Sequence, residues 1–369
     1  MSRFELGMTL DYVSNWSLEK AVNEIYQNAL DEETVNPDNK MYFVYDKDKQ
    51  ELTIGNQHGY LPVNTLLLGA STKRDNDDLI GQHGEGYKVA VIVLLRNGKT
   101  LKIYNNNRRE VWTAKTIKSR RYGCDVAVFD IAKDSIFSAE RPDAIEFVIG
   151  GISEEEYDAI RKINLHLKSD INVLKSSYGQ VILNDEERGN LYVNGLFICH
   201  KEQLNNGYNF KPSCIKLDRD RGLLDTWDVQ YTLGKLILGT ENVDFIVKMS
   251  HLWDGEYISS AMCWQENSVA DNVCNIMAEK FYKKYGKDAV PVTTQDKYNY
   301  YKSTGRNAVL VSSNDMYYIE NSTVYEPSND VADSPIDLLS SWFEGIESKL
   351  DEDEVTEFNA IFEMLKAQI

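Results

Sequence analysis

The sequence predicts a mixed fold of the α+β class, organised in two or three domains. Segments with apolar residues at helical spacing mix with short segments rich in β-branched and aromatic residues. Hydrophobic residues make up 42% of the chain and only 7 residues are Pro, which is typical of folded domains and excludes a disordered protein. The length of 369 residues exceeds the ~100–200 residues of a usual domain, so more than one core is expected.

The first 150 residues are expected to form one domain of helices and strands. A helix is predicted over 17–33, because its apolar residues recur on one face. A second helix is predicted to follow a glycine-rich segment and to end near Leu95. Strands are predicted at 41–45, 51–54, 100–104, 110–117 and 125–131.

The remaining chain is expected to form a second domain over 151–266 and a small α/β region over 267–369. In the second domain, helices are predicted at 154–167 and 226–238 and strands at 180–183 and 191–199. In the last region, helices are predicted at 268–285 and 295–303 and strands at 289–292 and 308–312, before two acidic helices separated near Asp351. Their apolar residues either pack on this region or offer a stripe to a partner.

The charge is strongly negative but unevenly distributed. The formal net charge is -18, and from Asp315 onward fourteen acidic residues face only two lysines. Residues 96–121 instead hold nine Lys and Arg against one Glu. The acidic balance argues against a protein whose whole surface binds nucleic acid. The basic patch at 96–121 is either a solvated set of strand faces or a surface for phosphate or a partner.

Neither a membrane nor an oxidising compartment is indicated. No apolar run approaches the ~20 residues of a membrane-spanning helix, and the first ten residues lack a signal-peptide pattern, so a cytoplasmic protein without a membrane partner is expected. The five cysteines are widely spaced and never form Cys-x-x-Cys, so neither a disulfide framework nor a zinc site is expected.

Two polar clusters in the first domain suggest a phosphate site. Glu24, Asn28 and Asp31 share one face of the first predicted helix, where a carboxylate can accept a proton and an amide oxygen can bind Mg²⁺. Such a row alternatively just faces water. Residues 79–90 read LIGQHGEGYKVA, and closely spaced glycines before a helix let backbone N–H groups approach phosphate oxygens. The preceding stretch Leu66–Lys73 adds two hydroxyls and a cation.

These motifs and their order resemble the superfamily of gyrase B, the ninety-kilodalton heat-shock chaperone, histidine kinases and MutL (GHKL), whose ATP site is the Bergerat fold. The resemblance covers roughly residues 10–131 and is closest to stand-alone bacterial or viral members. The matching segments are Glu24 to Asp31 for the N-box, Ile54 to Leu61 for the adenine-reading loop, Gly81 to Lys88 for the second glycine motif, and Gly123-Cys124-Asp125-Val126 for the Gly-Thr-x-Val element.

The resemblance implies that the site binds ATP with Mg²⁺. Glu24 would act as the catalytic residue that polarises the attacking water, and Asn28 would bind the Mg²⁺ that bridges the phosphates. Ser71, Thr72 and Lys73 would belong to a lid. The other residues implied in nucleotide binding are Asp31, Asn56, Gly59, Gly81, Gln82, His83, Gly84, Glu85, Gly86, Tyr87, Lys88 and Cys124.

The chain departs from the family pattern at two positions. Asn56 stands where the family has an Asp that accepts the adenine amino group, and Cys124 stands where it has a Thr. The amide of Asn56 can either accept or donate, so the choice of base is open at this point. His58 and His83 are next to glycines and are interpreted as loop positions near the nucleotide, with metal binding as the alternative.

The second domain resembles the S5-like transducer of the gyrase and MutL branches. Residues 189–197 read as a hairpin, and the segment KPSCIKLDRDRG at 211–222 is rich in cations. The resemblance implies that Arg219 or Arg221 reaches the γ-phosphate as a catalytic residue. Alternatively, both arginines pair with neighbouring aspartates. The Asp-Arg-Asp order also matches a Toprim metal motif, but the strand signature of that motif does not precede it.

The leading hypothesis is a slow, Mg²⁺-dependent ATPase that acts as a conformational switch on an unidentified protein partner. Nucleotide binding would order the lid and dock the second domain, and family members often form a homodimer on ATP binding. One alternative is a nucleotide-gated module that binds a protein without hydrolysis. Another is a nucleic-acid clamp that uses the 96–121 patch.

Overall fold

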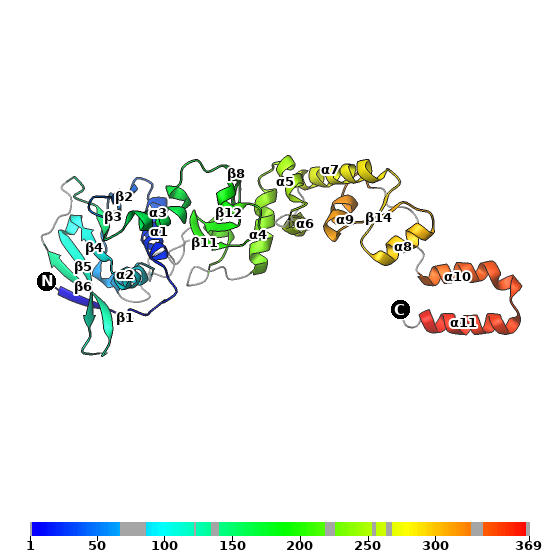
Figure 1. Cartoon of the computed structure of the whole chain (residues 1–369), viewed down its shortest axis with the longest axis horizontal. Coiled ribbons are helices and arrows are strands. Elements are labelled where there is room, and N and C mark those ends of the chain that lie inside the picture. Colours follow the sequence, from blue (N-terminus) through cyan, green and yellow to red (C-terminus); the bar gives the residue numbers. More distant parts are fainter. Residues whose placement is uncertain are drawn as a thin grey trace. The chain divides into compact units, whose positions relative to one another are not determined.

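The computed structural model describes residues 2–66, 86–121, 123–133, 140–217, 226–252, 256–262, 268–325 and 335–366. It confirms the mixed α+β class, and most strand pairs are antiparallel. The chain divides into two compact units, Met1–Val273 and Cys274–Ile369 (Figure 1). The first unit contains both larger sheets.

The first unit begins with a seven-stranded sheet in the order β1-β6-β5-β4-β7-β3-β2. Each neighbouring pair in this sheet is antiparallel. The strands are β1 (Ser2–Thr9), β2 (Met41–Asp46), β3 (Glu51–Asn56), β4 (Thr100–Asn105), β5 (Glu110–Lys118), β6 (Asp125–Lys133) and β7 (Ile145–Gly150).

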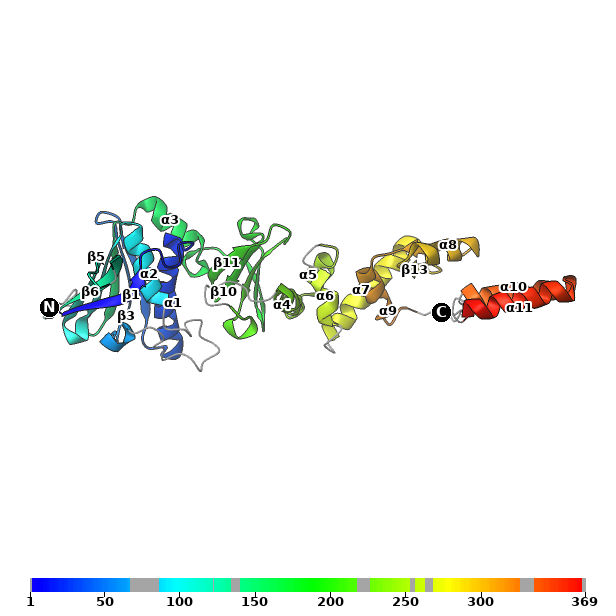
Figure 2. The same ribbon diagram turned by 90° about the horizontal axis from the view of Figure 1, so that it is seen from below.

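Two helices, α1 (Leu18–Val35) and α2 (Gly86–Arg96), pack against each other and against this sheet, as Figure 2 shows. Helix α1 begins after Ser17, whose side chain accepts a hydrogen bond from the N–H of Lys20 and so caps the first turn. Helix α2 is apolar on nearly every side, and Val89 to Leu94 are almost fully buried. This sandwich of two helices and one sheet holds the main core of the unit.

The N-terminal strand β1 was not predicted from the sequence. It pairs with β6, so that Phe4 lies opposite Phe129. Arg3 binds the carboxylate of Asp130 through Nε and Nη2 at 2.7 and 3.0 Å, and Lys115 of β5 binds the same carboxylate at 3.0 Å. The strand depends on a partner far along the chain, which a local sequence pattern does not reveal.

The second sheet of this unit has five strands in the order β11-β10-β12-β9-β8, with β10 and β12 parallel. The predicted hairpin is confirmed, and its strands meet at Asn194 and Gly195, both of positive φ. Such backbone angles favour glycine and asparagine in a tight turn. The strands are β8 (Val173–Ser176), β9 (Gly179–Ile182), β10 (Asn190–Val193), β11 (Leu196–His200) and β12 (Gly207–Phe210), and the helices that follow are α4 (Thr226–Leu238), α5 (Val243–Met249) and α6 (Glu256–Met262).

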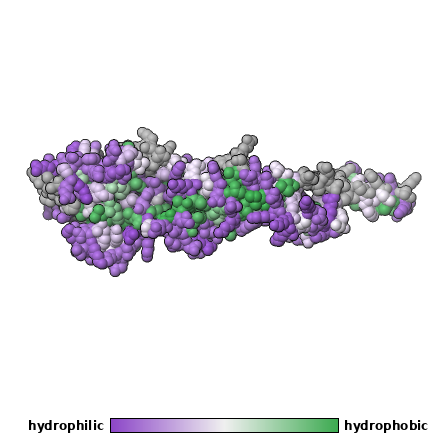
Figure 3. All heavy atoms as spheres, turned by 90° about the horizontal axis from the view of Figure 1, so that it is seen from above, coloured by the Kyte–Doolittle hydropathy of each residue, from purple (hydrophilic) through white to green (hydrophobic). Residues whose placement is uncertain are grey.

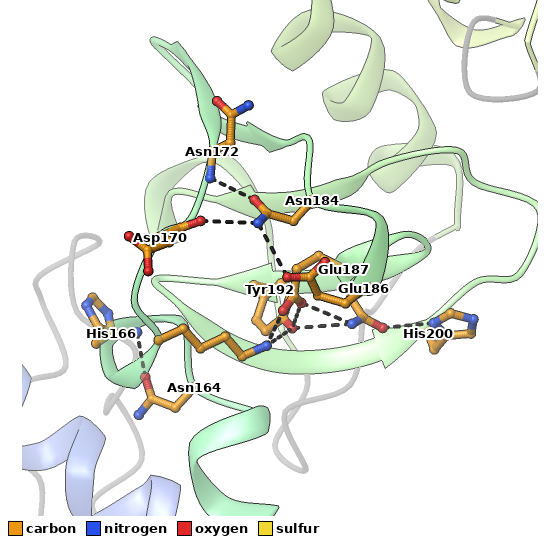
Figure 4. A network of polar contacts seen from close by, with 11 residues as sticks. Asn164, His166, Asp170, Asn172, Asn184, Glu186, Glu187, Tyr192 and His200 are labelled. Carbon is orange, nitrogen blue, oxygen red and sulfur yellow. Dashed lines mark hydrogen bonds and ion pairs between the residues drawn. The ribbon is translucent and has the colours of Figure 1, made fainter.

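A buried polar network joins the second sheet to the loop before it (Figure 4). The carboxylate of Glu187 accepts hydrogen bonds from Lys168, from the hydroxyl of Tyr192 and from Asn190. Burial raises the pKa of Glu187, but the hydrogen bonds outweigh this effect and hold the pKa below its ordinary value. Burial and the neighbouring carboxylate raise the pKa of Tyr192. The buried negative charge of Glu187 is therefore stabilised by hydrogen bonds from three neighbouring side chains.

Helix α3 (Glu154–Lys162) connects the two sheets but packs on the first one. Its Tyr157 stacks on Tyr45 of β2 with ring centroids 4.2 Å apart. From the following turn, His166 stacks on Tyr26 of α1 and forms a 2.8 Å hydrogen bond with the backbone oxygen of Asn194. These contacts fix the second sheet beside α1, and this contact region becomes important for the site.

The second unit contains a two-stranded parallel sheet. Its helices at 268–285 and 295–303 match the predicted positions, whereas the helix at 313–320 was not predicted. A small core forms around Phe281 and Ile319. Near its end, Phe343, Phe358 and Phe362 stack between two acidic helices. The elements are α7 (Ser268–Tyr285), which begins in the first unit, β13 (Val290–Val292), α8 (Gln295–Ser303), β14 (Ala308–Leu310), α9 (Ser313–Glu320), α10 (Pro335–Ile346) and α11 (Glu352–Lys366).

The face drawn in Figure 3 is mostly hydrophilic, with hydrophobic residues gathered in patches. None of the helices in the described part of the chain combines the length and the apolar character that crossing a membrane requires.

The ion pairs of Asp130 predict how stability depends on pH. Hydrogen bonds from Arg3 and then from Lys115 lower the pKa of Asp130 to about 2 in the folded protein. The ion pairs therefore stabilise the folded state fully above the pKa of Asp130 in the unfolded chain, about 3.9. This stabilisation is lost as the pH falls towards the pKa of Asp130 in the folded protein. We expect the unfolding free energy of Asp130→Asn to fall less than that of wild type between about pH 4 and pH 2.

Urea denaturation at several pH values measures this difference. The control is Asp38→Asn, the same change at an exposed carboxylate. Equal slopes for wild type and Asp130→Asn in this window would contradict the role of the ion pairs.

Candidate functional site

The three residues predicted on the first helix lie on α1, which faces the sheet and the start of α2. Glu24 is only 7% exposed and Asp31 only 1% exposed. The amide of Asn28 donates to the backbone oxygen of Glu24 at 2.8 Å. This bond commits the NH₂ group to the helix, so the atom that Asn28 can present to a cation is its carbonyl oxygen. The row is therefore largely buried, and the interpretation as a solvated face does not hold for Glu24 and Asp31.

Gly86, the first residue of α2, meets the Glu24 side chain directly. A Cβ atom at Gly86 would collide with Oε2 of Glu24 and would lie 3.2 Å from its Cδ. The predicted helix and the predicted glycine motif therefore converge at this point. The carboxylate lies at the N-terminal end of α2, where backbone N–H groups attract negative charge. Here the lack of a side chain makes room for a carboxylate, which the sequence interpretation did not anticipate.

The two residues that follow Gly86 are buried. Tyr87 donates its hydroxyl to Thr65 at 3.0 Å, and burial raises its pKa. Lys88 is fully buried in the first turn of α2. The other residues predicted in the lid and the glycine motif lie outside the described residues; they are Ser71, Thr72, Lys73, Gly81, Gln82, His83, Gly84 and Glu85.

Asn56, at the end of β3, has a fixed side-chain orientation. Its amide NH₂ donates to the backbone oxygens of Ala29 at 2.9 Å and of Asn39 at 3.3 Å. Because both partners are carbonyls and can only accept, the nitrogen must face them. The atom that Asn56 can offer to a ligand is therefore its carbonyl oxygen, an acceptor. The sequence left open whether the Asn56 side chain accepts or donates towards a ligand, and the two backbone oxygens leave it as an acceptor.

The loop after Asn56 is held by two buried asparagines. Asn39 accepts from the N–H of His58 at 2.8 Å and donates to its carbonyl at 2.9 Å. Asn105 does the same for Leu61, at 2.8 and 3.1 Å. Between them, Gly59 has φ +133° and donates to the carbonyl of Asp143. The loop is therefore preorganised by side chains that sequence reasoning missed, because an isolated Asn carries no motif.

The assignment of Cys124 requires a correction. Cys124 lies in the turn between β5 and β6, and β5, β4 and β7 separate β6 from β3 in the sheet. Neighbouring strands are ~4.8 Å apart, so this turn is too far across the sheet to contact a group held by Asn56. The residue paired with Asn56 on the neighbouring strand is Ile145. The prediction failed because motif order along the chain does not fix strand order.

A cavity lies where α1 meets the second sheet. Glu24 lines it together with four other residues of the α1 region, and Leu217 lines it from the second sheet's side with residues of β10 and β11. Arg219 and Arg221, the predicted cations, lie outside the described residues, but Leu217 is the last described residue before them.

Several cations of the 96–121 patch have local partners. Arg96 donates to backbone oxygens of the segment before α1, including that of Trp16 at 3.0 Å. Lys99 pairs with Glu156 at 2.6 Å, and Arg108 lies over the ring of Tyr60 at 3.5 Å. These contacts favour local structural roles for these three cations.

The predicted histidine sites give no metal centre among the residues that the structure describes. No group of three or more His, Cys, Asp or Glu side chains there has a metal-binding arrangement. His58 is held through its backbone by Asn39, which agrees with a loop position, and His83 lies outside the described residues.

Comparisons with known proteins give limited similarity. A family model described as the Mycoplasma pneumoniae MPN635 N-terminal domain matches residues 155–243, which include the second sheet. Among solved structures, the chain is similar to the ATPase region of Saccharomyces cerevisiae topoisomerase II bound to ICRF-187 (dexrazoxane), with 12% sequence identity and a TM-score of 0.32. This similarity covers 49% of this chain and 62% of that chain. No curated protein matches the sequence.

The contact between Gly86 and Glu24 predicts coupled effects of substitution. We expect Gly86→Ala to lower the unfolding free energy by about 1–3 kcal/mol, because the new methyl group displaces the buried carboxylate. In the double variant with Glu24→Ala, most of this loss should disappear. A double-mutant cycle by chemical denaturation measures the coupling. Gly345→Ala is the control, since a Cβ atom there meets open space. Additive losses would show that the two residues do not touch.

The orientation of Asn56 predicts that an aspartate at this position destabilises the protein. Asn56→Asp places a carboxylate against the carbonyls of Ala29 and Asn39, and we expect a loss of about 1–3 kcal/mol at neutral pH. The loss should shrink as the pH falls, because a protonated carboxyl group can donate one hydrogen bond. Chemical denaturation at several pH values tests this. The exposed control Asn107→Asp should change stability by less than about 0.5 kcal/mol. A neutral or stabilising effect of Asn56→Asp would refute the assigned orientation.

Proposed function

We propose that this protein binds ATP with Mg²⁺ in a GHKL-type site and hydrolyses it slowly, as a nucleotide-driven switch. The observation that carries the proposal is the contact of Glu24 with Gly86, which joins the N-box helix to the glycine motif. This chemistry requires a catalytic carboxylate close to a helix end that binds phosphate. The Glu24 side chain lies against Gly86, the first residue of α2.

Electrostatics supports a need for Mg²⁺. Glu24 and Asp31 are buried carboxylates on the helix that would face the triphosphate. Two sets of negative charge repel each other strongly in a partly desolvated site unless a cation lies between them. Asn28 offers a neutral carbonyl oxygen of the kind that Mg²⁺ accepts, one turn after Glu24. Bound Mg²⁺ would neutralise charge on the phosphates and hold them in position for attack.

The fixed acceptor of Asn56 supports adenine as the base. The exocyclic amino group of adenine donates hydrogen bonds, so it complements the carbonyl oxygen of Asn56. Guanine carries an oxygen acceptor at the corresponding position, which would face another acceptor. An unpaired, partly buried polar group costs about 1–3 kcal/mol, enough for roughly a tenfold to hundredfold preference for ATP over GTP.

Hydrolysis would use Glu24 as the general base for the attacking water. Arg219 or Arg221 would stabilise the charge that develops on the transferred phosphoryl group, delivered from the segment that begins after Leu217. Closure of the lid with Ser71, Thr72 and Lys73 would exclude solvent. Because the second sheet packs beside α1, binding at the phosphate end can be transmitted to it.

The partner proposed for this switch is another protein, with a second copy of the chain as one form of it. The acidic helices α10 and α11 expose Trp342, Ile361 and Met364, which suit a protein rather than a nucleic acid. We place this activity in the cytoplasm.

Nucleotide binding and turnover test the proposal together. We expect Mg²⁺–ATP to bind more tightly than GTP and more tightly than ATP with a chelator, as measured by calorimetry. Glu24→Gln should reduce kcat by about 10²- to 10⁴-fold and keep ATP affinity, because it removes the base and preserves shape. Glu19→Gln on the same helix is the control and should retain activity.

Other outcomes distinguish the alternatives. Binding of ATP without turnover in wild type would favour the non-hydrolysing protein-binding module. Absence of nucleotide binding by the full chain would reject the proposal. Tight DNA or RNA binding that weakens steeply with salt would favour the nucleic-acid clamp instead.

A further inference from the structure

The segment 279–306 of the second unit is basic, in a chain whose formal net charge is -18. It contains seven Lys and Arg residues against three Asp and Glu residues, and five tyrosines lie among them. It runs from the second half of α7 through β13 to just beyond α8. Cations that gather in this way in an acidic protein indicate a surface for a negatively charged partner.

The parallel pairing of β13 and β14 brings the ends of α7 and α8 together. Each strand follows one of these helices along the chain, and Val290 pairs with Ala308. Because two parallel strands begin at the same edge of a sheet, the C-terminal ends of both helices lie at that edge. The amide of Asn307 also donates to the carbonyl of Tyr285, the last residue of α7, at 2.8 Å. The side chains at this edge form what we call the helix-end surface, which consists of Lys284, Tyr285, Lys287, Tyr301, Lys302 and Arg306.

The lysines of the helix-end surface are available to a ligand. Lys284, Lys287 and Lys302 are all exposed. Within the described part of the chain, none of the three forms an ion pair with a carboxylate. Several cations of the 96–121 patch have local partners instead, so the two basic regions differ in this respect.

The helix ends account for only part of this positive charge. Lys284 and Lys302 lie in the last turns of α7 and α8, where a cation compensates about half a negative charge at each helix end. Burial, and then the charges of Glu320 and Tyr301, raise the pKa of Tyr325, so Glu320 of α9 lies in the same region. With this carboxylate and both helix ends counted, an excess of about two positive charges remains. Salt screens exposed charges beyond about 8 Å, so acidic residues farther away do not cancel it.

Tyrosine rings lie beside these cations. Tyr285 is 38% exposed, and Nζ of Lys284 lies 4.7 Å from the centroid of its ring. The guanidinium of Arg306 lies 5.5 Å from the ring centroid of Tyr301, which is half-buried. Proteins bind single-stranded nucleic acids with cations that neutralise phosphates and with aromatic rings on which bases stack. In a duplex the bases already stack on each other, so an exposed ring favours a single strand.

We propose that the helix-end surface binds single-stranded nucleic acid without sequence preference. Lys284, Lys287, Lys302 and Arg306 contact phosphates, and Tyr285 stacks on a base. This binding goes beyond the proposed nucleotide switch and does not depend on it. It also uses a different part of the chain from the 96–121 patch.

Fluorescence anisotropy with the full wild-type chain and no ATP tests the proposal. The probe is a labelled oligothymidylate of about 12 nucleotides, within the usual length of a single-strand site. We expect a Kd of about 1–100 μM near physiological salt. Four phosphate contacts predict that log K falls with log[salt] with a slope of about -3. A duplex of the same length should bind at least about tenfold more weakly.

The first variant locates the phosphate contacts. The triple variant Lys284→Gln, Lys287→Gln and Lys302→Gln should bind at least about tenfold more weakly, and its salt slope should be smaller by about 2. The matched control replaces three exposed cations of the 96–121 patch and should bind like wild type; it is Lys102→Gln, Lys118→Gln and Arg120→Gln. Thermal unfolding followed by circular dichroism checks that both triple variants are folded.

The second variant tests stacking. Tyr285→Leu keeps an apolar contact with Phe281, whose ring centroid lies 5.2 Å from that of Tyr285, and removes the aromatic face. We expect binding about tenfold weaker, with an unchanged salt slope. Tyr12→Leu is the control, because Tyr12 is 37% exposed and lies in the first unit.

Several results would overturn the proposal. These are absence of binding at low salt, equal affinity for the duplex, or full affinity in either the lysine variant or Tyr285→Leu. Loss of binding only in the 96–121 control would assign nucleic-acid binding to that patch instead. Binding to phosphatidylserine vesicles but not to the oligonucleotide would make this a membrane surface. ATP binding should be the same in the lysine variant as in wild type, so failure of the proposed ATPase and failure of this proposal are observed separately.

Discussion

The arrangement of the first unit depends on how closely Glu24 approaches Gly86. The end of the buried Glu24 side chain occupies the space that a Cβ atom at position 86 would take. It is held in place by the packing of two helices whose apolar faces share one core with the sheet. A side chain at position 86 would displace the Glu24 carboxylate from its present position, so the glycine and the glutamate form one structural feature.

The rest of the site is built mainly from buried amides. Asn39 and Asn105 hold the loop after β3 by pairing with backbone groups, and Asn56 is fixed by two carbonyls. Each amide satisfies groups that a loop would otherwise expose to solvent. A loop fixed in this way does not need to reorganise when a base binds, which lowers the entropic cost of binding. On the other side of α1, Asn23 and Gln27 line the cavity beside the second sheet.

Much of the fold could be predicted from the sequence, because local patterns specify most helices and hairpins. The predicted bounds of α4, α7 and α8 coincide with those observed. Strand β1 and the position of Cys124 could not be predicted, since both depend on which strands become neighbours. Of the site, the row on α1 and Gly86 were predicted, but the role of Asn39 depends on contacts that no spacing rule encodes.

The most direct measurement is a crystal structure of the full chain with Mg²⁺ and a non-hydrolysable ATP analogue. The account predicts the phosphates at the N-terminus of α2 beside Glu24, Mg²⁺ on the carbonyl oxygen of Asn28, and the adenine amino group on the carbonyl oxygen of Asn56. A nucleotide bound away from α1 and α2, or bound with its base remote from Asn56, would contradict it.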